Sequence, residues 1–341
     1  MLFTTNVYDH NGILTAFANN PIVITAEVQN GDFVSNTTLY QLRLIVAVQD
    51  NYEETKSYSF SSQFTQNEEK IDIDISSAFV AWYMFRDRNK EPAHTDNGYE
   101  ACQSKITAEV TYVRDGDEFT GTKMLVVEKL YVIRGEVPTR QRQMLGNPSN
   151  AVQYYSNRLS AKPTDEVRNI GDTHIVSSFN YETKTVESTR TMLTESNVAS
   201  VEDTAITLED NPRRREFFFR NRFGVIESVS AFAYEKKEVA MESERYPIVT
   251  APSFAPKLNV MTKARISAEA YECSSGYVTE EWAKWWTEDF LTAEYHWMRT
   301  EIDGEEVVMP CHVEPSDDDV TLFDNTDNRL YEVVFKVEVL M

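Results

Sequence analysis

The stretch that decides the fold class is Leu39–Val48, which reads LYQLRLIVAV. Its apolar residues Leu42, Leu44, Val46 and Val48 recur at every second position. Successive side chains of a strand point to opposite faces, so a period of two is typical of a strand with one buried face. The segment therefore predicts a β-strand in a sheet that covers a hydrophobic core.

The same alternation recurs along most of the chain. Two short helices are also expected, one over Ala78–Phe85 and one starting at Thr279. Because no long helices separate the strands, we predict an all-β, mainly antiparallel fold with two β-sandwich-like domains and short helices. Further strands are predicted at Ile22–Val28, Tyr58–Phe64, Ile71–Ile75, Ile106–Val113, Phe119–Val127, Ala264–Cys273 and Leu330–Leu340.

Two domains are expected for a chain of 341 residues. We place an N-terminal β-sandwich at 1–138 and a C-terminal β-sandwich with a Trp-rich helix at 173–341. The intervening polar segment, 139–172, is predicted to be an extended arm or linker. Arg140 and Arg142 lie in this arm, which is suited to clasp a neighbouring subunit.

The net charge of the chain limits the classes of partner that it can bind. With 55 acidic against 33 basic residues, the formal net charge is -22. This argues against general binding of duplex DNA and against docking on anionic membranes. The N-terminus lacks the features of a signal peptide, and no apolar run approaches a membrane span, so synthesis in a cytoplasm is expected. The three cysteines are predicted to be reduced and buried.

Recognisable catalytic and metal-binding motifs are missing from the sequence. We therefore predict a protein that is not an enzyme and has no cofactor or metal. Two weaker hypotheses remain, a Ca²⁺ site and a sugar-cleaving site. Asp317–Asp319 resembles a Ca²⁺ ligand cluster, although turn residues are the preferred interpretation. Glu280 and Glu281 beside the tryptophans resemble a sugar-cleaving site, although acidic residues also suit the start of a helix.

The most unusual stretch is Asn211–Gly224, which reads NPRRREFFFRNRFG and concentrates five arginines in an acidic protein. A phosphate contact, an ion-pair strip between subunits and pairing with the chain's own carboxylates are the three interpretations. The many acidic residues favour ion pairs over nucleic acid. The candidate interface arginines are Arg213, Arg214, Arg215, Arg220 and Arg222.

Phe219–Glu227 resembles an aromatic–x–Asn-Arg-aromatic/Leu-Gly motif of β-rich structural proteins from phages that infect Bacteroidetes, including the crAss-like group. In that motif Asn221, Arg222 and Gly224 are the matching positions. The resemblance implies a turn or a close backbone approach at Gly224 and ion pairing by Arg222. Other segments that look similar are Leu39–Phe79, Tyr131–Gly135, Trp286–Thr292, Val308–Pro310 and Asn328–Leu330.

This resemblance implies a component of the virion, made in the cytoplasm of the host bacterium. The expected function is a ring-forming tail or portal–tail connector protein, assembled from copies of itself beside neighbouring virion proteins. DNA would be only passing cargo, repelled by an acidic lumen. The main alternative is a head or tail fibre or glycan-binding adhesin, with Trp282, Trp285 and Trp286 as the candidate glycan or partner contact. A glycoside hydrolase is ranked last.

Overall fold

The structure is a computed structural model. The chain folds into two compact units. The first comprises 1–160, 175–191 and 220–227, and the second comprises 161–174, 192–219 and 228–341. The structure describes residues 1–27, 39–49, 55–64, 70–89, 93–96, 101–114, 117–120, 123–137, 158–201, 205–236, 243–249, 258–264, 269–302, 304–316 and 330–339.

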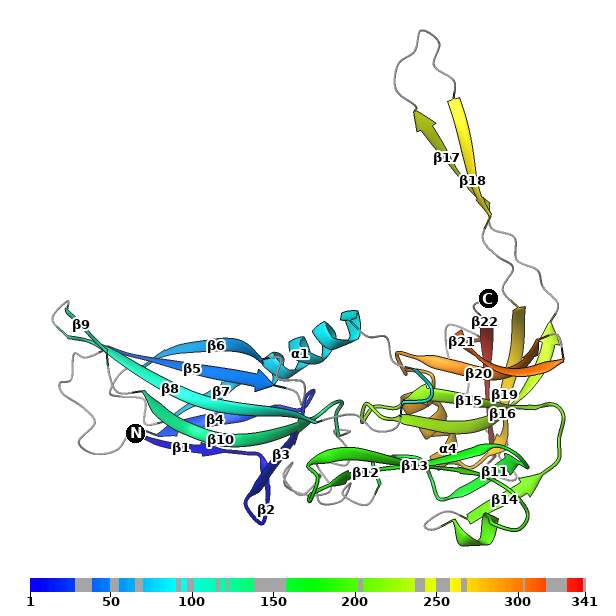
Figure 1. Cartoon of the computed structure of the whole chain (residues 1–341), viewed down its shortest axis with the longest axis horizontal. Coiled ribbons are helices and arrows are strands. Elements are labelled where there is room, and N and C mark those ends of the chain that lie inside the picture. Colours follow the sequence, from blue (N-terminus) through cyan, green and yellow to red (C-terminus); the bar gives the residue numbers. More distant parts are fainter. Residues whose placement is uncertain are drawn as a thin grey trace. The chain divides into compact units, whose positions relative to one another are not determined.

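The prediction of an all-β fold is confirmed, because strands dominate both units (Figure 1). The predicted domain boundaries differ from the two units. Segments 175–191 and 220–227, expected in the C-terminal domain, belong to the first unit. Local alternation of apolar residues predicts strands but does not say which sheet each strand joins. The sequence pattern therefore could not show that each unit contains several separate segments of the chain.

The first unit contains a three-stranded sheet, β1-β4-β7, and a seven-stranded sheet with the path β2-β3-β10-β8-β5-β6 and β9 paired to β8. Its elements up to Ile133 are β1 Leu2–Thr5, β2 Tyr8–His10, β3 Ile13–Phe17, β4 Val23–Glu27, β5 Leu39–Gln49, β6 Thr55–Phe64, β7 Lys70–Asp74, α1 Ser76–Asn89, β8 Cys102–Arg114, β9 Asp117–Thr120 and β10 Met124–Ile133.

Both sheets and α1 contribute to one hydrophobic core. Leu42 and Leu44 of β5 are buried there beside Ile24 of β4 and Trp82 of α1. The helix buries only one side, because Met84 is exposed. The helix therefore packs on the core through one face.

The second unit is built around a closed six-stranded barrel in the order β15-β16-β19-β22-β21-β20. We predicted a sandwich here. Closure pairs the first and last strands of a sheet and removes its open edges, which alternation alone does not reveal. The strands are β15 Arg214–Arg220, β16 Ile226–Lys236, β19 Glu269–Val278, β20 His296–Ile302, β21 Glu305–Pro315 and β22 Tyr331–Val339.

The short helix α4, Glu280–Trp285, follows β19 and continues into the π-helical segment η2, Trp286–Phe290. Thr279 is its N-cap and accepts a hydrogen bond from the backbone N–H of Trp282, as the sequence predicted. The aromatic side chains of both segments enter the barrel core. They pack there against Phe217, Phe219 and Phe335.

Three pairs of strands lie outside these larger sheets. β11 Asp165–Asn169 pairs in parallel with β14 Ala205–Glu209, and a 3-10 turn, Val198–Ser200, precedes β14. β12 Thr173–Asn180 pairs with β13 Thr185–Met192. β17 Ser243–Val249 pairs with β18 Leu258–Ala264. Within the predicted arm, Asp165–Asn169 form strand β11, while 139–157 lie outside the described residues.

Candidate functional site

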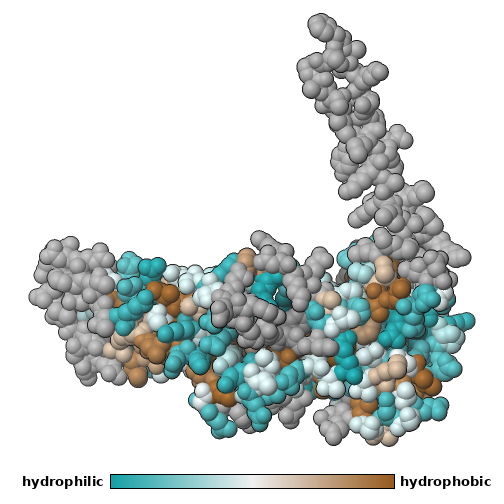
Figure 2. Space-filling model, viewed as in Figure 1, coloured by the Kyte–Doolittle hydropathy of each residue, from teal (hydrophilic) through white to brown (hydrophobic). Residues whose placement is uncertain are grey.

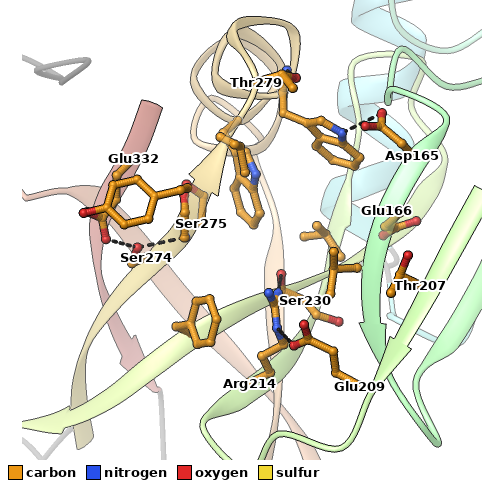
Figure 3. A pocket seen from close by; sticks show the side chains of 18 of the residues that line it. Asp165, Glu166, Thr207, Glu209, Arg214, Ser230, Ser274, Ser275, Thr279 and Glu332 are labelled. Carbon is orange, nitrogen blue, oxygen red and sulfur yellow. Dashed lines mark hydrogen bonds and ion pairs between the residues drawn. The ribbon is translucent and has the colours of Figure 1, made fainter. Parts of the chain in front are cut away.

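A pocket of about 660 Å³ opens in the second unit between the β11–β14 pair and barrel strands β16, β19 and β22. Figure 3 shows polar side chains around it: Glu332 and Ser274 on one side, Asp165 and Thr207 on the other. The aromatic residues that line it are Phe232, Tyr234, Tyr277, Trp282 and Trp286. The pocket thus combines apolar walls with several hydrogen-bond acceptors, as small-ligand sites do.

Two of the pocket carboxylates are held by neighbouring groups (Figure 3). The indole N–H of Trp282 donates to Oδ1 of Asp165 across 3.1 Å. On the opposite side, the Ser274 hydroxyl donates to Oε1 of Glu332 across 2.5 Å. Each carboxylate is therefore fixed through one oxygen.

An irregularity in β19 places Ser274. The pairing of β19 with β22 shifts between Ser274 and Tyr277, and Gly276 there has φ +70°. The backbone N–H of Gly276 donates to the Ser274 hydroxyl. A Cβ at Gly276 would lie 2.7 Å from the Phe232 ring, so only glycine suits this wall of the pocket.

Arg214 forms the floor on the β15 side. Its Nε donates to Glu209 across 3.2 Å, and its guanidinium carbon lies 4.1 Å from the centre of the Phe232 ring. The arginine is thus paired with a carboxylate and stacked on an aromatic face at once, an arrangement that suits its planar guanidinium.

A buried ionic network lies behind the β11 wall. Arg168 has no solvent exposure and contacts three carboxylates, those of Glu166, Asp172 and Glu216. Lys162 also pairs with Glu166, and Arg299 with Glu216. The network therefore joins three cations to three carboxylates, so its formal charges balance.

The two most buried carboxylates of this network titrate differently. Burial acts to raise the pKa of Glu166, but Lys162 and Arg168 overcome this and hold the pKa at about 2. Burial raises the pKa of Glu216 to about 7, against the opposing effect of Arg168 and Arg299. Glu166 lines the pocket, and its charge there is compensated from behind.

The arginine-rich stretch does not form one continuous strip. Arg214 lines the pocket, whereas Arg213 is exposed and has no ion-pair partner within the described part of the chain. Arg215 is partly exposed, and within the described part of the chain it donates only to the backbone oxygen of Pro212. Arg213 and Arg215 are therefore the members of the stretch that remain available to another molecule.

The motif residues are placed in a tight turn of the first unit. Asn221 is buried, accepts hydrogen bonds from the backbone N–H groups of Phe223 and Val225, and donates to Glu227. Gly224 has φ +79°, as expected for a turn.

Other residues of this turn also form ion pairs and hydrogen bonds with the first unit. Arg220 is 4% exposed and pairs with Asp87, which also binds Arg134. The backbone oxygen of Arg222 accepts from the N–H of Glu136. The expectation of a subunit contact at Arg220 is therefore corrected, because its side chain is buried and paired inside the chain, whereas Arg222 is partly exposed and its role at an interface stays a prediction.

The three tryptophans of the second helix form part of the barrel core. Trp282, Trp285 and Trp286 are 7%, 4% and 2% exposed, and successive pairs of their rings meet edge to face. Burial leaves little ring face for stacking on a sugar, although Trp282 and Trp286 also line the pocket, so a glycan or partner contact at these tryptophans stays a prediction. The spacing of the three tryptophans along the helix is thus explained by their packing in the barrel core.

Glu280 and Glu281, the candidate sugar-cleaving carboxylates, are exposed, and Glu280 pairs with Lys284. Arg140, Arg142 and Asp317–Asp319 lie outside the described residues. Among the residues that the structure describes, no group of three or more metal-ligating side chains is positioned to hold a metal ion. Within the same residues, no helix is long and apolar enough to span a membrane.

The pocket could not be predicted from the sequence, because its walls come from elements far apart in the chain. Asp165 and Glu166 lie in the segment expected to be a linker, while Glu332 lies near the C-terminus. The only local signal was Gly276 within an otherwise alternating strand, which is typical of a bulge or a close backbone approach.

Compared with protein-family models, with curated proteins and with solved structures, the chain has no match.

Proposed function

We propose that this chain is a virion structural protein that forms a ring with copies of itself, in a phage tail or portal–tail connector around the DNA channel. The observation that carries the proposal is the β17–β18 ribbon. Its strands pair with each other from Ser243 and Ala264 to Val249 and Leu258, and with no other described strand. An isolated two-stranded ribbon is marginally stable in water, so it gains from a partner.

The ribbon also offers the chemistry of strand addition. Each of its strands has an outer edge of backbone N–H and C=O groups that no other described strand pairs with. Such edges pair readily with a strand from another chain, and proteins cover or block them when they do not use them. A neighbouring subunit is the partner that a ring supplies.

Charge supports the same assembly. Arg213 is exposed without an ion-pair partner in the described part of a chain whose net charge is -22. A neighbouring copy presents many carboxylates that such an arginine can bind. The remaining acidic surface suits a channel through which DNA passes without adhering.

The glycan-binding alternative is weakened, because the tryptophans on which it relied are largely buried and only Trp282 and Trp286 of them line the pocket. Neither Glu280 nor Glu281, the carboxylates on which the sugar-cleaving alternative relied, lines the pocket. Assembly is therefore the function we retain.

Mass photometry of a variant in which residues 243–264 are replaced by a short Gly-Ser linker tests the role of the ribbon. We expect the wild-type chain to form one closed oligomer and the variant to remain monomeric with an intact barrel. A matched control, Glu280→Gln with Lys284→Gln, removes an exposed ion pair of the same unit and should assemble normally. Assembly of the ribbon variant to the wild-type size would refute the role assigned to the ribbon.

A further inference from the structure

We infer that the pocket between β11, β14 and the barrel binds a small organic cation, an ammonium or guanidinium group carried on a short apolar chain. This goes beyond the assembly function and does not depend on it. Charge is the first argument. Asp165, Glu209 and Glu332 line the pocket, and Arg214 is the only cation among the described residues that line it.

Glu166 also lines the pocket but adds little to its charge. Lys162 lies 2.9 Å from one of its oxygens and Arg168 lies 2.9 Å from the other. Among the described residues that line the pocket, the three remaining carboxylates and the one arginine leave two formal negative charges to be compensated from solution. A cation supplies that compensation, whereas an anion would be repelled.

The second argument is the supply of hydrogen-bond acceptors. Asp165 and Glu332 each bind a protein donor through one oxygen, and Glu209 binds Arg214 through Oε2. The second oxygen of each of these three has no partner among the described residues. Three unused acceptors on different walls match a ligand that carries several N–H donors.

The third argument is the aromatic surface between these acceptors. Tyr277 is 71% exposed and Tyr234 is 47% exposed, and both line the pocket with Phe232 and Trp282. Aromatic faces attract cations, and the site already contains one such contact, that of Arg214 with Phe232. The same rings give an apolar wall for the chain that carries the cation.

The site is also held in shape before a ligand arrives. The bulge at Gly276 fixes Ser274 and through it Glu332, and the Trp282 indole fixes Asp165. A preformed site loses less entropy on binding. A neutral sugar would use the same acceptors but would leave the two negative charges uncompensated, so sugar binding is the competing outcome.

Isothermal titration with agmatine, which carries a guanidinium and an ammonium on a four-carbon chain, tests the inference. The variant Asp165→Asn with Glu332→Gln keeps the acceptors for Trp282 and Ser274 but removes two charges. We expect it to weaken agmatine binding by about tenfold or more. Tyr277→Ala should weaken binding by about threefold, the size of an exposed cation–π contact.

The matched control is Glu280→Gln with Glu281→Gln, which removes two carboxylates of the same unit outside the pocket and should bind agmatine as the wild type does. Methyl glucoside serves as the neutral probe and should not bind. The inference is overturned if agmatine does not bind, if both double variants bind it as the wild type does, or if methyl glucoside binds in its place.

Discussion

The guanidinium of Arg168 lies 2.8 Å from the carboxylate of Glu216, and neither side chain has any solvent exposure. The two residues come from β11 and β15, so this pair joins the small parallel sheet to the barrel within the second unit. A buried ion pair does little for stability compared with well-packed apolar residues, but removing one partner leaves the other charge buried and unpaired.

Arg168→Leu should therefore destabilise the second unit strongly. Glu166, Asp172 and Glu216 would lose a shared cation inside the protein, at a cost of about 3–5 kcal/mol. Urea unfolding followed by tryptophan fluorescence measures this loss. The control, Lys284→Ala, removes an exposed pair with Glu280 and should cost less than about 0.5 kcal/mol. Similar losses in the two variants would argue that the network is solvated.

Gly135→Ala should disrupt the first unit. Gly135 has φ +90°, and a Cβ there would lie 2.0 Å from the backbone oxygen of Arg222, which cannot move without breaking the turn that Asn221 holds. We expect insoluble protein or a loss of more than about 3 kcal/mol in the free energy of unfolding.

Gly12→Ala is the matched control for that change. Gly12 has φ +85°, but no atom lies within 4 Å of an added Cβ. Only the cost of the backbone conformation remains, about 1–2 kcal/mol. Thermal unfolding of both variants separates the two effects, and equal losses would contradict the close approach at Gly135.

His296 should make the barrel sensitive to mild acid. Its ring is buried, and burial lowers its pKa from 6.5 to about 4. The folded state keeps the ring neutral while the unfolded state binds a proton below pH 6.5. Stability is therefore full above pH 6.5 and falls as the pH decreases toward 4, by about 3 kcal/mol from this residue.

His296→Phe tests that dependence. It keeps an aromatic ring beside Phe219 and Phe290 but removes the hydrogen bond with the Phe290 oxygen, which costs about 1 kcal/mol at every pH. The difference in unfolding free energy between pH 7 and pH 4.5 should be smaller in the variant. An unchanged difference would exclude His296 as its source.

The thiols should be inert in the folded chain. Cys102, Cys273 and Cys311 are buried, and burial raises the pKa of Cys102 to about 12 and also raises the pKa of the other two. The thiolate is the reactive form. Reaction with a chromogenic disulfide reagent at pH 8 should therefore be negligible in buffer and should reach three thiols per chain in guanidinium. Rapid reaction in buffer would contradict the burial.

Local features of the fold could be predicted from the sequence. The alternation in Leu39–Val48 became β5, and Thr279 caps its helix. The strands predicted at Ile22–Val28 and Ile71–Ile75 became β4 and β7. In each case the residues that determine the element are neighbours in the chain.

Features set by distant residues could not be predicted. Closure of the barrel depends on β15 pairing with β20, and the alternation within each strand is the same in an open sheet. Arg168 lay in a polar segment that resembled a linker, because a buried charged residue and a solvated one look alike until their partners are known. The pocket was missed for the same reason.

Electron microscopy of the purified chain at high concentration tests the proposed assembly most directly. The account predicts closed rings of one size, which the ribbon variant lacking residues 243–264 does not form. A population of compact monomers for the wild-type chain, with mass photometry giving the mass of a single chain, would contradict it.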